Sequence, residues 1–151
     1  MKIYLLTHEK EFKRPTNTGN IVTSVLKGIS GQFLWQRKNP HKDILNVIDT
    51  KDAVLLFNGS EGEIIDDITS VENFIILDGT WQEARKIYNK SPYLKKMKTF
   101  TLNISTKSIN NLRRNQREGG LCTAECVIEI LKIKGDSKNA EKLNSSLLDF
   151  L

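Results

Sequence analysis

A chain of 151 residues is long enough to bury one core and too short for two ordinary domains, so we expect a single domain over residues 1–151. Its hydrophobic fraction of 38% and charged fraction of 27% are typical of a folded globular protein. No apolar run approaches the ~20 residues of a membrane span. The apolar start at residues 3–6 is soon followed by Glu9 and Glu11, unlike a signal peptide. We therefore expect a cytoplasmic protein with no membrane partner.

Short apolar runs and helix-like segments alternate along the chain. Residues 53–57 and 73–77 are continuous apolar runs, typical of strands covered on both faces of a parallel sheet. Thr80 and Glu83 fit a capping box, which predicts a helix start. The expected fold class is an α/β domain with a mostly parallel sheet. The predicted strands are residues 2–7, 33–35, 53–57, 73–77 and 98–102, the predicted helices 18–27, 80–89, 123–134 and 138–150, and the predicted loops include 8–17 and 37–42.

The positive charge of the chain is concentrated in one segment. Residues 84–117 contain no acidic residue and ten of the 23 Lys and Arg, which leaves 13 basic against 18 acidic residues elsewhere. A solvated lysine-rich face is one interpretation, but a uniform bias towards Lys would not empty this segment alone of Asp and Glu. We therefore predict a surface that contacts nucleic-acid phosphates. Its basic residues are Arg85, Lys86, Lys90, Lys95, Lys96, Lys98, Arg113, Arg114 and Arg117, together with Lys107.

Three polar segments occupy positions where parallel α/β sheets bind ligands, namely Asn58-Gly59-Ser60, Asp78-Gly79-Thr80-Trp81 and residues 118–123. Asp78 is the strongest candidate, because it stands between a buried strand and a helix start and would direct its carboxylate into the cleft. Alternatively, Asp78 only accepts hydrogen bonds from helix N–H groups, which is common before a helix. The chain has no glycine-rich phosphate-binding motif, which argues against nucleoside triphosphates and dinucleotides.

The two cysteines, Cys122 and Cys126, lie one helical turn apart. This spacing suits neither a disulfide framework nor a complete zinc site. A two-ligand metal clip is an alternative, but small buried side chains on a helix are favoured. His8 and His41 are the only histidines, and neither stands in a recognisable arrangement with a cysteine or serine. Nucleophilic catalysis therefore has little support.

Three motifs, in the same order along the chain, resemble those of the DTW family of tRNA-uridine aminocarboxypropyltransferases. They are an N-terminal pattern, a central Asp-x-[Thr/Ser]-Trp signature and a late helix start, matched here by His8, Glu11 and Thr16-Asn17-Thr18, by Asp78-Gly79-Thr80-Trp81, and by Leu121-Cys122-Thr123-Ala124-Glu125-Cys126. The resemblance covers about residues 4–131. The chain departs from the family in having Glu9 for Pro, Cys122 for Ser and Cys126 for Ala. It also begins directly at the first strand, without the family's N-terminal cysteine cluster, so we predict no bound zinc.

The resemblance implies that the chain transfers the 3-amino-3-carboxypropyl group of S-adenosylmethionine to N3 of a uridine in tRNA, releasing 5′-methylthioadenosine. It also implies a SPOUT-like fold with a C-terminal trefoil knot near the cofactor. Asp78 would be catalytic, either accepting the N3 proton or orienting the uracil. The candidate cofactor-binding residues are Thr16, Asn17, Thr18, Asn58, Gly59, Gly79, Thr80, Trp81, Gly120, Leu121, Cys122, Thr123 and Glu125.

Other interpretations remain at this stage. Trp81 would equally suit core packing, and Glu125 a charge favoured by the helix dipole. A SPOUT-type RNA methyltransferase would share the fold and cofactor but leave S-adenosylhomocysteine. A non-catalytic RNA-binding module would bind no cofactor, and a small-molecule transferase is disfavoured by the basic segment. The sequence predicts no particular oligomeric state.

Overall fold

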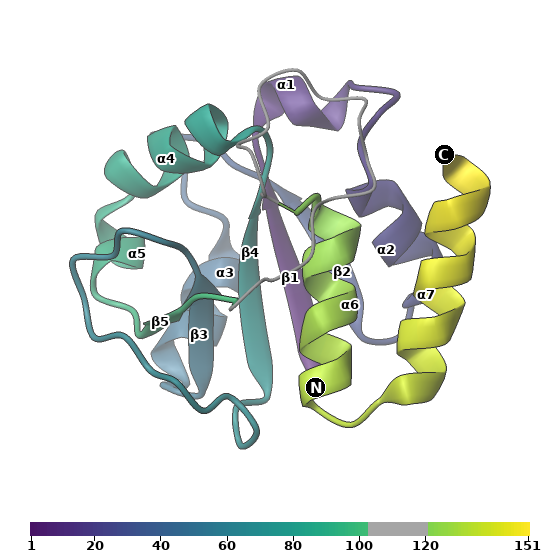
Figure 1. Cartoon of the computed structure of the whole chain (residues 1–151). Helices are drawn as coiled ribbons and strands as arrows, with labels where there is room; N and C mark the ends of the chain where they lie inside the picture. Colours follow the sequence, from purple (N-terminus) through teal and green to yellow (C-terminus); the bar gives the residue numbers. More distant parts are fainter. Residues whose placement is uncertain (103–120) are drawn as a thin grey trace.

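The centre of the molecule is a parallel β-sheet (Figure 1). We describe a computed structural model of the chain, covering residues 1–102 and 121–151. All pairings in the five-stranded sheet are parallel, and the strand order is β2-β1-β4-β3-β5. The predicted α/β class is therefore confirmed. The strands are β1 (Lys2–Thr7), β2 (Ser30–Leu34), β3 (Ala53–Leu56), β4 (Asn73–Asp78) and β5 (Thr99–Phe100).

Helices cover both faces of the sheet (Figure 1). One face packs against α2, α6 and α7, and the other against α3, α4 and α5. Within the described ranges, no helix is long and apolar enough to cross a membrane. The helices are α1 (Glu9–Phe12), α2 (Gly19–Val25), α3 (Lys42–Asp49), α4 (Trp81–Asn89), α5 (Pro92–Lys95), α6 (Thr123–Ile133) and α7 (Ser137–Phe150).

The continuous apolar runs of the sequence supply two cores at once. Successive side chains of a strand point to opposite faces of the sheet. In β4, Phe74 and Ile76 join the core under α2, α6 and α7, whereas Ile75 and Leu77 join the core under α3, α4 and α5. All four side chains are buried. An unbroken apolar run is thus what a strand between two helical layers requires.

The sequence missed three short helices and part of one strand. Helix α1 lies inside the predicted loop 8–17, α5 follows α4, and α3 begins at the end of the predicted loop 37–42. The α3 helix buries Ile44 and Val47 and is capped by the His41 side chain, which accepts a hydrogen bond from Asp43 N. Strand β2 begins at Ser30, three residues before its predicted start, because pairing with β1 overrides the weak strand preference of Gly31.

The connection between β5 and α6 falls on residues 103–120. The predicted knot depends on this connection and therefore lies outside the described residues. The same holds for Gly120 of the predicted cofactor site and for Lys107, Arg113, Arg114 and Arg117 of the predicted RNA-binding surface.

The chain leaves the two central strands towards opposite faces of the sheet. After β1 it continues to α2 on one face, and after β4 it continues to α4 on the other. The ends of these strands lie side by side, with Thr7 paired to Asp78. A change of direction of this kind opens a crevice at the carboxyl ends of parallel strands, where α/β proteins bind ligands. The topology therefore directs attention to Asp78.

The turn between α6 and α7 yields a first prediction. Gly135 has φ of 80°, Gly135 N donates to Lys132 O (3.1 Å), and Asp136 N donates to Leu131 O (2.9 Å), which together form a Schellman cap. We expect Gly135→Ala to lower the free energy of unfolding by about 1 kcal/mol, because a Cβ disfavours positive φ. Urea denaturation measures this. Gly28→Ala is the control, since a Cβ there meets nothing within 4 Å; equal losses in both variants would contradict the prediction.

Candidate functional site

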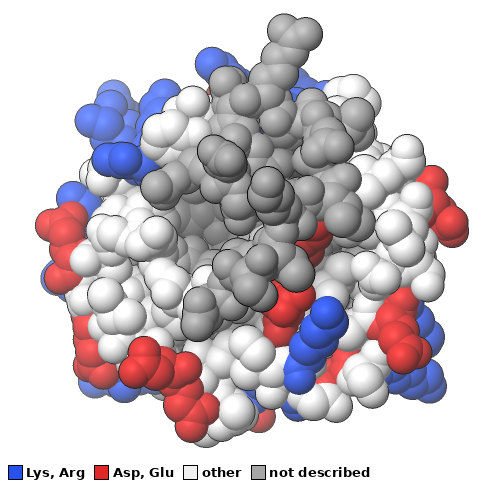
Figure 2. All heavy atoms as spheres, viewed as in Figure 1, with Lys and Arg blue, Asp and Glu red and all other residues white. Residues whose placement is uncertain are grey.

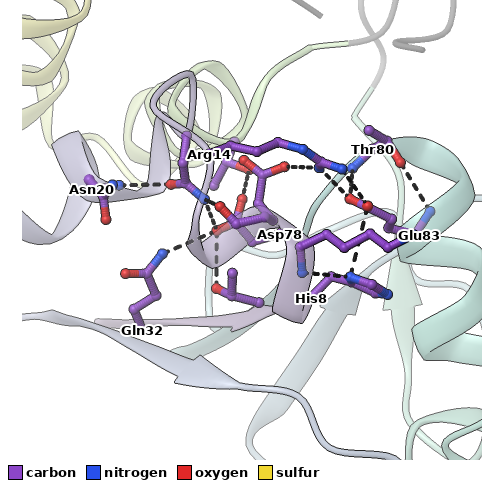
Figure 3. A network of polar contacts seen from close by, with 12 residues as sticks. His8, Arg14, Asn20, Gln32, Asp78, Thr80 and Glu83 are labelled. Atoms are coloured by element: carbon purple, nitrogen blue, oxygen red, sulfur yellow. Dashed lines mark hydrogen bonds and ion pairs between the residues drawn. The ribbon is translucent and has the colours of Figure 1, made fainter.

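The buried carboxyl group of Asp78 joins four separate segments of the chain (Figure 3). Its Oδ2 atom accepts hydrogen bonds from Thr7 Oγ1 in β1 (3.0 Å), Asn17 Nδ2 before α2 (3.1 Å) and Gln32 Nε2 in β2 (3.3 Å). Its Oδ1 atom accepts one from Thr123 Oγ1 at the start of α6 (2.7 Å). We call Thr7, Asn17, Gln32, Asp78 and Thr123 the Asp78 cluster. The alternative that Asp78 only bonds to helix N–H groups does not describe this arrangement.

The Thr16-Asn17-Thr18 motif connects the Asp78 cluster to two helices. Asn17 Oδ1 accepts a hydrogen bond from Asn20 N (3.0 Å) in the first turn of α2, while its Nδ2 reaches Asp78. Thr18 Oγ1 accepts a hydrogen bond from Ala124 N (3.1 Å) in the first turn of α6. Asn17 and Thr18 are both buried, whereas Thr16 is half-buried. The motif thus fixes the starts of α2 and α6 relative to the end of β4.

The first residue of α2 approaches Asp78 so closely that only glycine fits. A Cβ atom placed on Gly19 would lie 2.7 Å from Asn17 Oδ1 and 2.7 Å from Asp78 Oδ2. Both oxygens are held by their hydrogen bonds and have little freedom to move away. Gly19 is therefore part of the site even though it supplies no side chain.

A salt bridge beside the Asp78 cluster ties α1 to α4. Arg14 Nη1 and Nη2 donate to the two carboxylate oxygens of Glu83 at 2.6 Å each, and Arg14 Nη1 also reaches Glu11 Oε1 at 2.7 Å. Burial alone would raise the pKa of Glu83. The hydrogen bonds from Arg14 and from Thr80 N, with the charge of Arg14, outweigh burial and lower that pKa to about 2. We call Arg14 and Glu83 the brace.

His8 links the strand end to its surroundings. Its backbone N–H donates to Asp78 O (3.0 Å), and its Nδ1 accepts from Lys10 N (3.1 Å) as the cap of α1. Its ring stacks on that of Trp35, with centroids 5.9 Å apart. Burial lowers the pKa of His8, with nearby Lys and Arg adding to the shift and Glu83 opposing it. In the N-terminal motif, His8 and Glu11 thus stabilise the backbone and side chains around the site.

The residues after Asp78 have the predicted capping box, which is confirmed. Thr80 Oγ1 accepts from Glu83 N (3.2 Å), and Glu83 Oε1 accepts from Thr80 N (2.9 Å). A Cβ on Gly79 would lie 3.0 Å from Glu83 Oε1. The alternative that Trp81 packs in the core is wrong, because this residue is 38% exposed and has the Arg85 guanidinium 5.9 Å from its ring centroid.

The start of α6 lies where the late motif predicts it. Cys122 is the cap residue, Glu125 Oε1 accepts from Cys122 N (3.0 Å), and Leu121 is half-buried just before them. The helix-start interpretation of Glu125 thus describes its position. Burial raises the pKa of Cys122 to about 11 and also raises that of Cys126, so both thiols stay protonated at neutral pH. The interpretation of both cysteines as small side chains on a helix agrees with this.

Not every predicted site residue joins the Asp78 cluster. Asn58 and Gly59 are exposed after β3. Neither takes part in the hydrogen bonds that the described residues form with Asp78. Potential metal ligands do not gather in groups of three or more within residues 1–102 and 121–151. The absence of zinc stays a prediction.

Part of the predicted RNA-binding surface lies on α4 and the segment after it. Arg85 and Lys86 are exposed on α4, and Lys90 is exposed at its C-cap. Lys95 is half-buried and pairs with Glu61 at 3.3 Å. Lys96 and Lys98 are exposed before β5. Figure 2 shows blue side chains gathered at the upper left, where α4 lies in Figure 1, and red side chains mainly along the lower left and the right.

Sequence reasoning missed several members of the site. Thr7 and Gln32 donate to Asp78 from β1 and β2, Gly19 gives the close approach, and Arg14 forms the brace. Thr7 directly precedes His8 of the N-terminal motif at the end of a predicted strand, and this position could have identified it as a site residue. Gln32 is a polar residue next to an apolar run, and only the register of β2 against β1 brings it to the site.

The fold and site define a parallel α/β protein with a buried carboxyl group at its topological switch point. The family model of the DTW domain matches residues 1–151, so the chain belongs to the DTW domain family. It is 26% identical over 140 residues to tRNA-uridine aminocarboxypropyltransferase 2 of Drosophila melanogaster, covering 87% of this chain and 55% of that protein. It is 24% identical over 141 residues to the Macaca fascicularis protein of the same name, covering 87% and 47%. The chain thus spans about half the length of these relatives. No solved structure matches it significantly.

The close approach of Gly19 gives a second prediction. In a helix, replacing Gly with Ala normally stabilises by up to ~1 kcal/mol. We expect Gly19→Ala instead to destabilise the protein by about 1–3 kcal/mol, because the added Cβ displaces Asn17 and Asp78 from their hydrogen bonds. Gly28→Ala again serves as the control. If Gly19→Ala unfolds at the same or a higher urea concentration than the parent, the close approach at Gly19 does not contribute to stability.

The brace gives a prediction on pH. The pKa of Glu83 is depressed to about 2, so its contribution to stability is complete above its ordinary pKa and is lost as the pH falls from about 5 towards 2. We expect Glu83→Gln to lower stability at pH 7 by about 1–3 kcal/mol and to flatten the loss between pH 5 and pH 3. Urea denaturation across this range measures both. Glu129→Gln removes a half-buried carboxylate whose partner, Lys132, is exposed at 3.4 Å, and it should change little. An equal effect of both variants would refute the brace.

Proposed function

We propose that this chain transfers the 3-amino-3-carboxypropyl group of S-adenosylmethionine to N3 of a uridine in tRNA, releasing 5′-methylthioadenosine, in the cytoplasm. The observation that carries the proposal is the Asp78 cluster, a buried polar site at the switch point of a DTW-family sheet. The printed names of the two relatives supply the reaction and the acceptor. The basic side chains on α4 support an RNA partner.

The donor suits the chemistry of the residues around the switch point. S-adenosylmethionine carries an ammonium group and a sulfonium, and these cations suit the polar surroundings of the Asp78 cluster. Its adenine offers an aromatic face, for which the exposed ring of Trp81 is a stacking partner in the turn after Asp78. The segment 121–123 opens α6, whose N-terminus favours a carboxylate. We assign the predicted cofactor contacts to Gly79, Thr80, Trp81 and the start of α6, with Thr16–Thr18 holding that start in place.

The resemblance implies that Asp78 either accepts the N3 proton or orients the uracil, and we assign it instead to positioning the protein segments around the site. Both of its carboxylate oxygens already accept hydrogen bonds, from Thr123 on Oδ1 and from three donors on Oδ2. Asp78 therefore fixes the strand end and the start of α6 against each other. The uridine N3 forms a bond to the terminal carbon of the aminocarboxypropyl group, the carbon–sulfur bond breaks towards sulfur, and the N3 proton passes to water.

Positioning also decides which carbon of the donor reacts. Three carbons are bonded to the sulfonium, and the one in line with the nucleophile is attacked. A site that holds the amino and carboxylate groups of the methionyl part leaves its γ-carbon, the methylene bonded to sulfur, exposed to attack. The rigid start of α6, held by Thr18 and Thr123, is suited to that task.

The test uses purified protein, bulk tRNA and S-adenosylmethionine labelled in the carboxypropyl part. We expect label in uridine and free 5′-methylthioadenosine. Asp78→Asn should lower transfer at least 100-fold at all pH values, because the amide cannot accept all the donors that Asp78 accepts. A shift of the pH–rate profile instead would assign Asp78 to proton transfer.

Asp136→Asn is the matched control, since Asp136 caps α7 at the other end of α6 and asparagine is an equally good cap. It should retain full transfer. Release of S-adenosylhomocysteine would identify a methyltransferase. Tight tRNA binding without any product would identify an RNA-binding module.

A further inference from the structure

A concave surface lies beside the Asp78 cluster. It is a groove of about 850 Å³, lined by residues of α1, of the segment after β2 and of α4. Its lining carries five exposed basic side chains against a single carboxylate, that of Glu9. We call it the basic groove, and its basic residues are Lys10, Lys13, Arg37, Lys38 and Lys86. Only Lys86 belongs to the acid-free segment of residues 84–117, so the groove is a separate concentration of positive charge.

The basic groove also offers flat and apolar surfaces. Trp35 is buried at its base, fixed by the stacked ring of His8 and by a hydrogen bond from its Nε1 to Ser91 Oγ (2.8 Å). Phe12 and Leu34 line the groove with 40% and 37% of their surface exposed. Cations together with aromatic faces are what single-stranded nucleic acid requires, because phosphates pair with the cations and bases stack on the rings. An acidic protein segment would use the cations and leave the rings unused.

The groove and the Asp78 cluster share a wall. His8 lines the groove, and its N–H donates to Asp78 O (3.0 Å). The preceding Thr7 donates to the Asp78 side chain (3.0 Å). On another side, Lys86 extends the groove to α4, which carries Arg85. A single-stranded nucleic acid that occupies the groove therefore passes next to the Asp78 cluster.

We propose that the basic groove binds the nucleotides next to the target uridine as single-stranded RNA. Lys10, Lys13 and Lys38 hold phosphates, and Phe12 stacks on a base. The identity of the target uridine rests on the proposed function, but binding of single-stranded RNA in the groove does not depend on catalysis. Four of the five basic residues of the groove lie outside the acid-free segment, so the groove adds affinity to that of the segment.

The test compares two triple variants with the same change in net charge. Lys10→Gln/Lys13→Gln/Lys38→Gln alters the groove, and Lys27→Gln/Lys138→Gln/Lys142→Gln alters exposed lysines elsewhere. Binding of tRNA and of a uridine-rich oligonucleotide is measured between 50 and about 200 mM salt. We expect the groove variant to bind at least tenfold more weakly and to lose about two units of salt slope, since each single-strand phosphate contact contributes ~0.7. The control should stay within about twofold of the parent.

A second measurement locates the oligonucleotide. In a Trp81→Phe background, Trp35 is the only tryptophan of the chain. Its fluorescence should change at the oligonucleotide concentration that gives binding, and Phe12→Ala should weaken binding about fivefold or more. An unchanged Trp35 signal during binding would place the RNA elsewhere and overturn the inference.

The outcomes separate this inference from the proposed function. Equal weakening in both triple variants, or equal competition by polyglutamate and the oligonucleotide, would overturn RNA binding in the groove even if transfer to uridine occurs. Absence of RNA binding by the parent would overturn it as well. Selective loss in the groove variant would uphold it even if no aminocarboxypropyl group is transferred.

Discussion

The hydrogen bonding of one buried carboxyl group organises the centre of this protein. A buried polar group costs free energy unless partners surround it. Asp78 meets this requirement with donors from β1, from the start of α2, from β2 and from the start of α6. These donors lie between 45 and 71 residues away in sequence. The carboxyl group is therefore satisfied only when the sheet and the two helices have assembled around it, so that folding and site formation are one event.

The topology explains why ligand-binding groups can gather at this point of the sheet. β1 and β4 are neighbours, yet the chain leaves them for helices on opposite faces. Among the described residues, the connections that follow these two strand ends therefore diverge. The two cores on either side are apolar and closely packed, whereas several buried polar side chains gather at the ends of β1 and β4. The Asp78 cluster occupies that place, and the start of α6 closes one side of it through Thr18 and Ala124.

Local patterns in the sequence predict most of the fold, and long-range geometry accounts for what they miss. The apolar runs at β3 and β4, the capping box at Thr80 and the start of α6 all depend on neighbours within a few residues. The place of Asp78 at a strand end is enough to predict it as a site residue. The roles of Gln32, Gly19 and Arg14 depend instead on strand register and on contacts between distant segments, which a single sequence does not encode in a readable form. Trp81 looked equally suited to the core because helical spacing alone does not give its exposure.

The brace gives the site a rigidity that the Asp78 cluster alone would lack. Helix α1 has only four residues and is too short to be stable without tertiary contacts. The two-point pairing of Arg14 with Glu83 fastens this segment to α4, and Glu83 at the same time caps α4 through Thr80. His8 lies between them, with its N–H on Asp78 O and its ring on Trp35. His8 therefore contacts the end of β4 and also lines the basic groove, so the same residue forms the boundary between the groove and the Asp78 cluster.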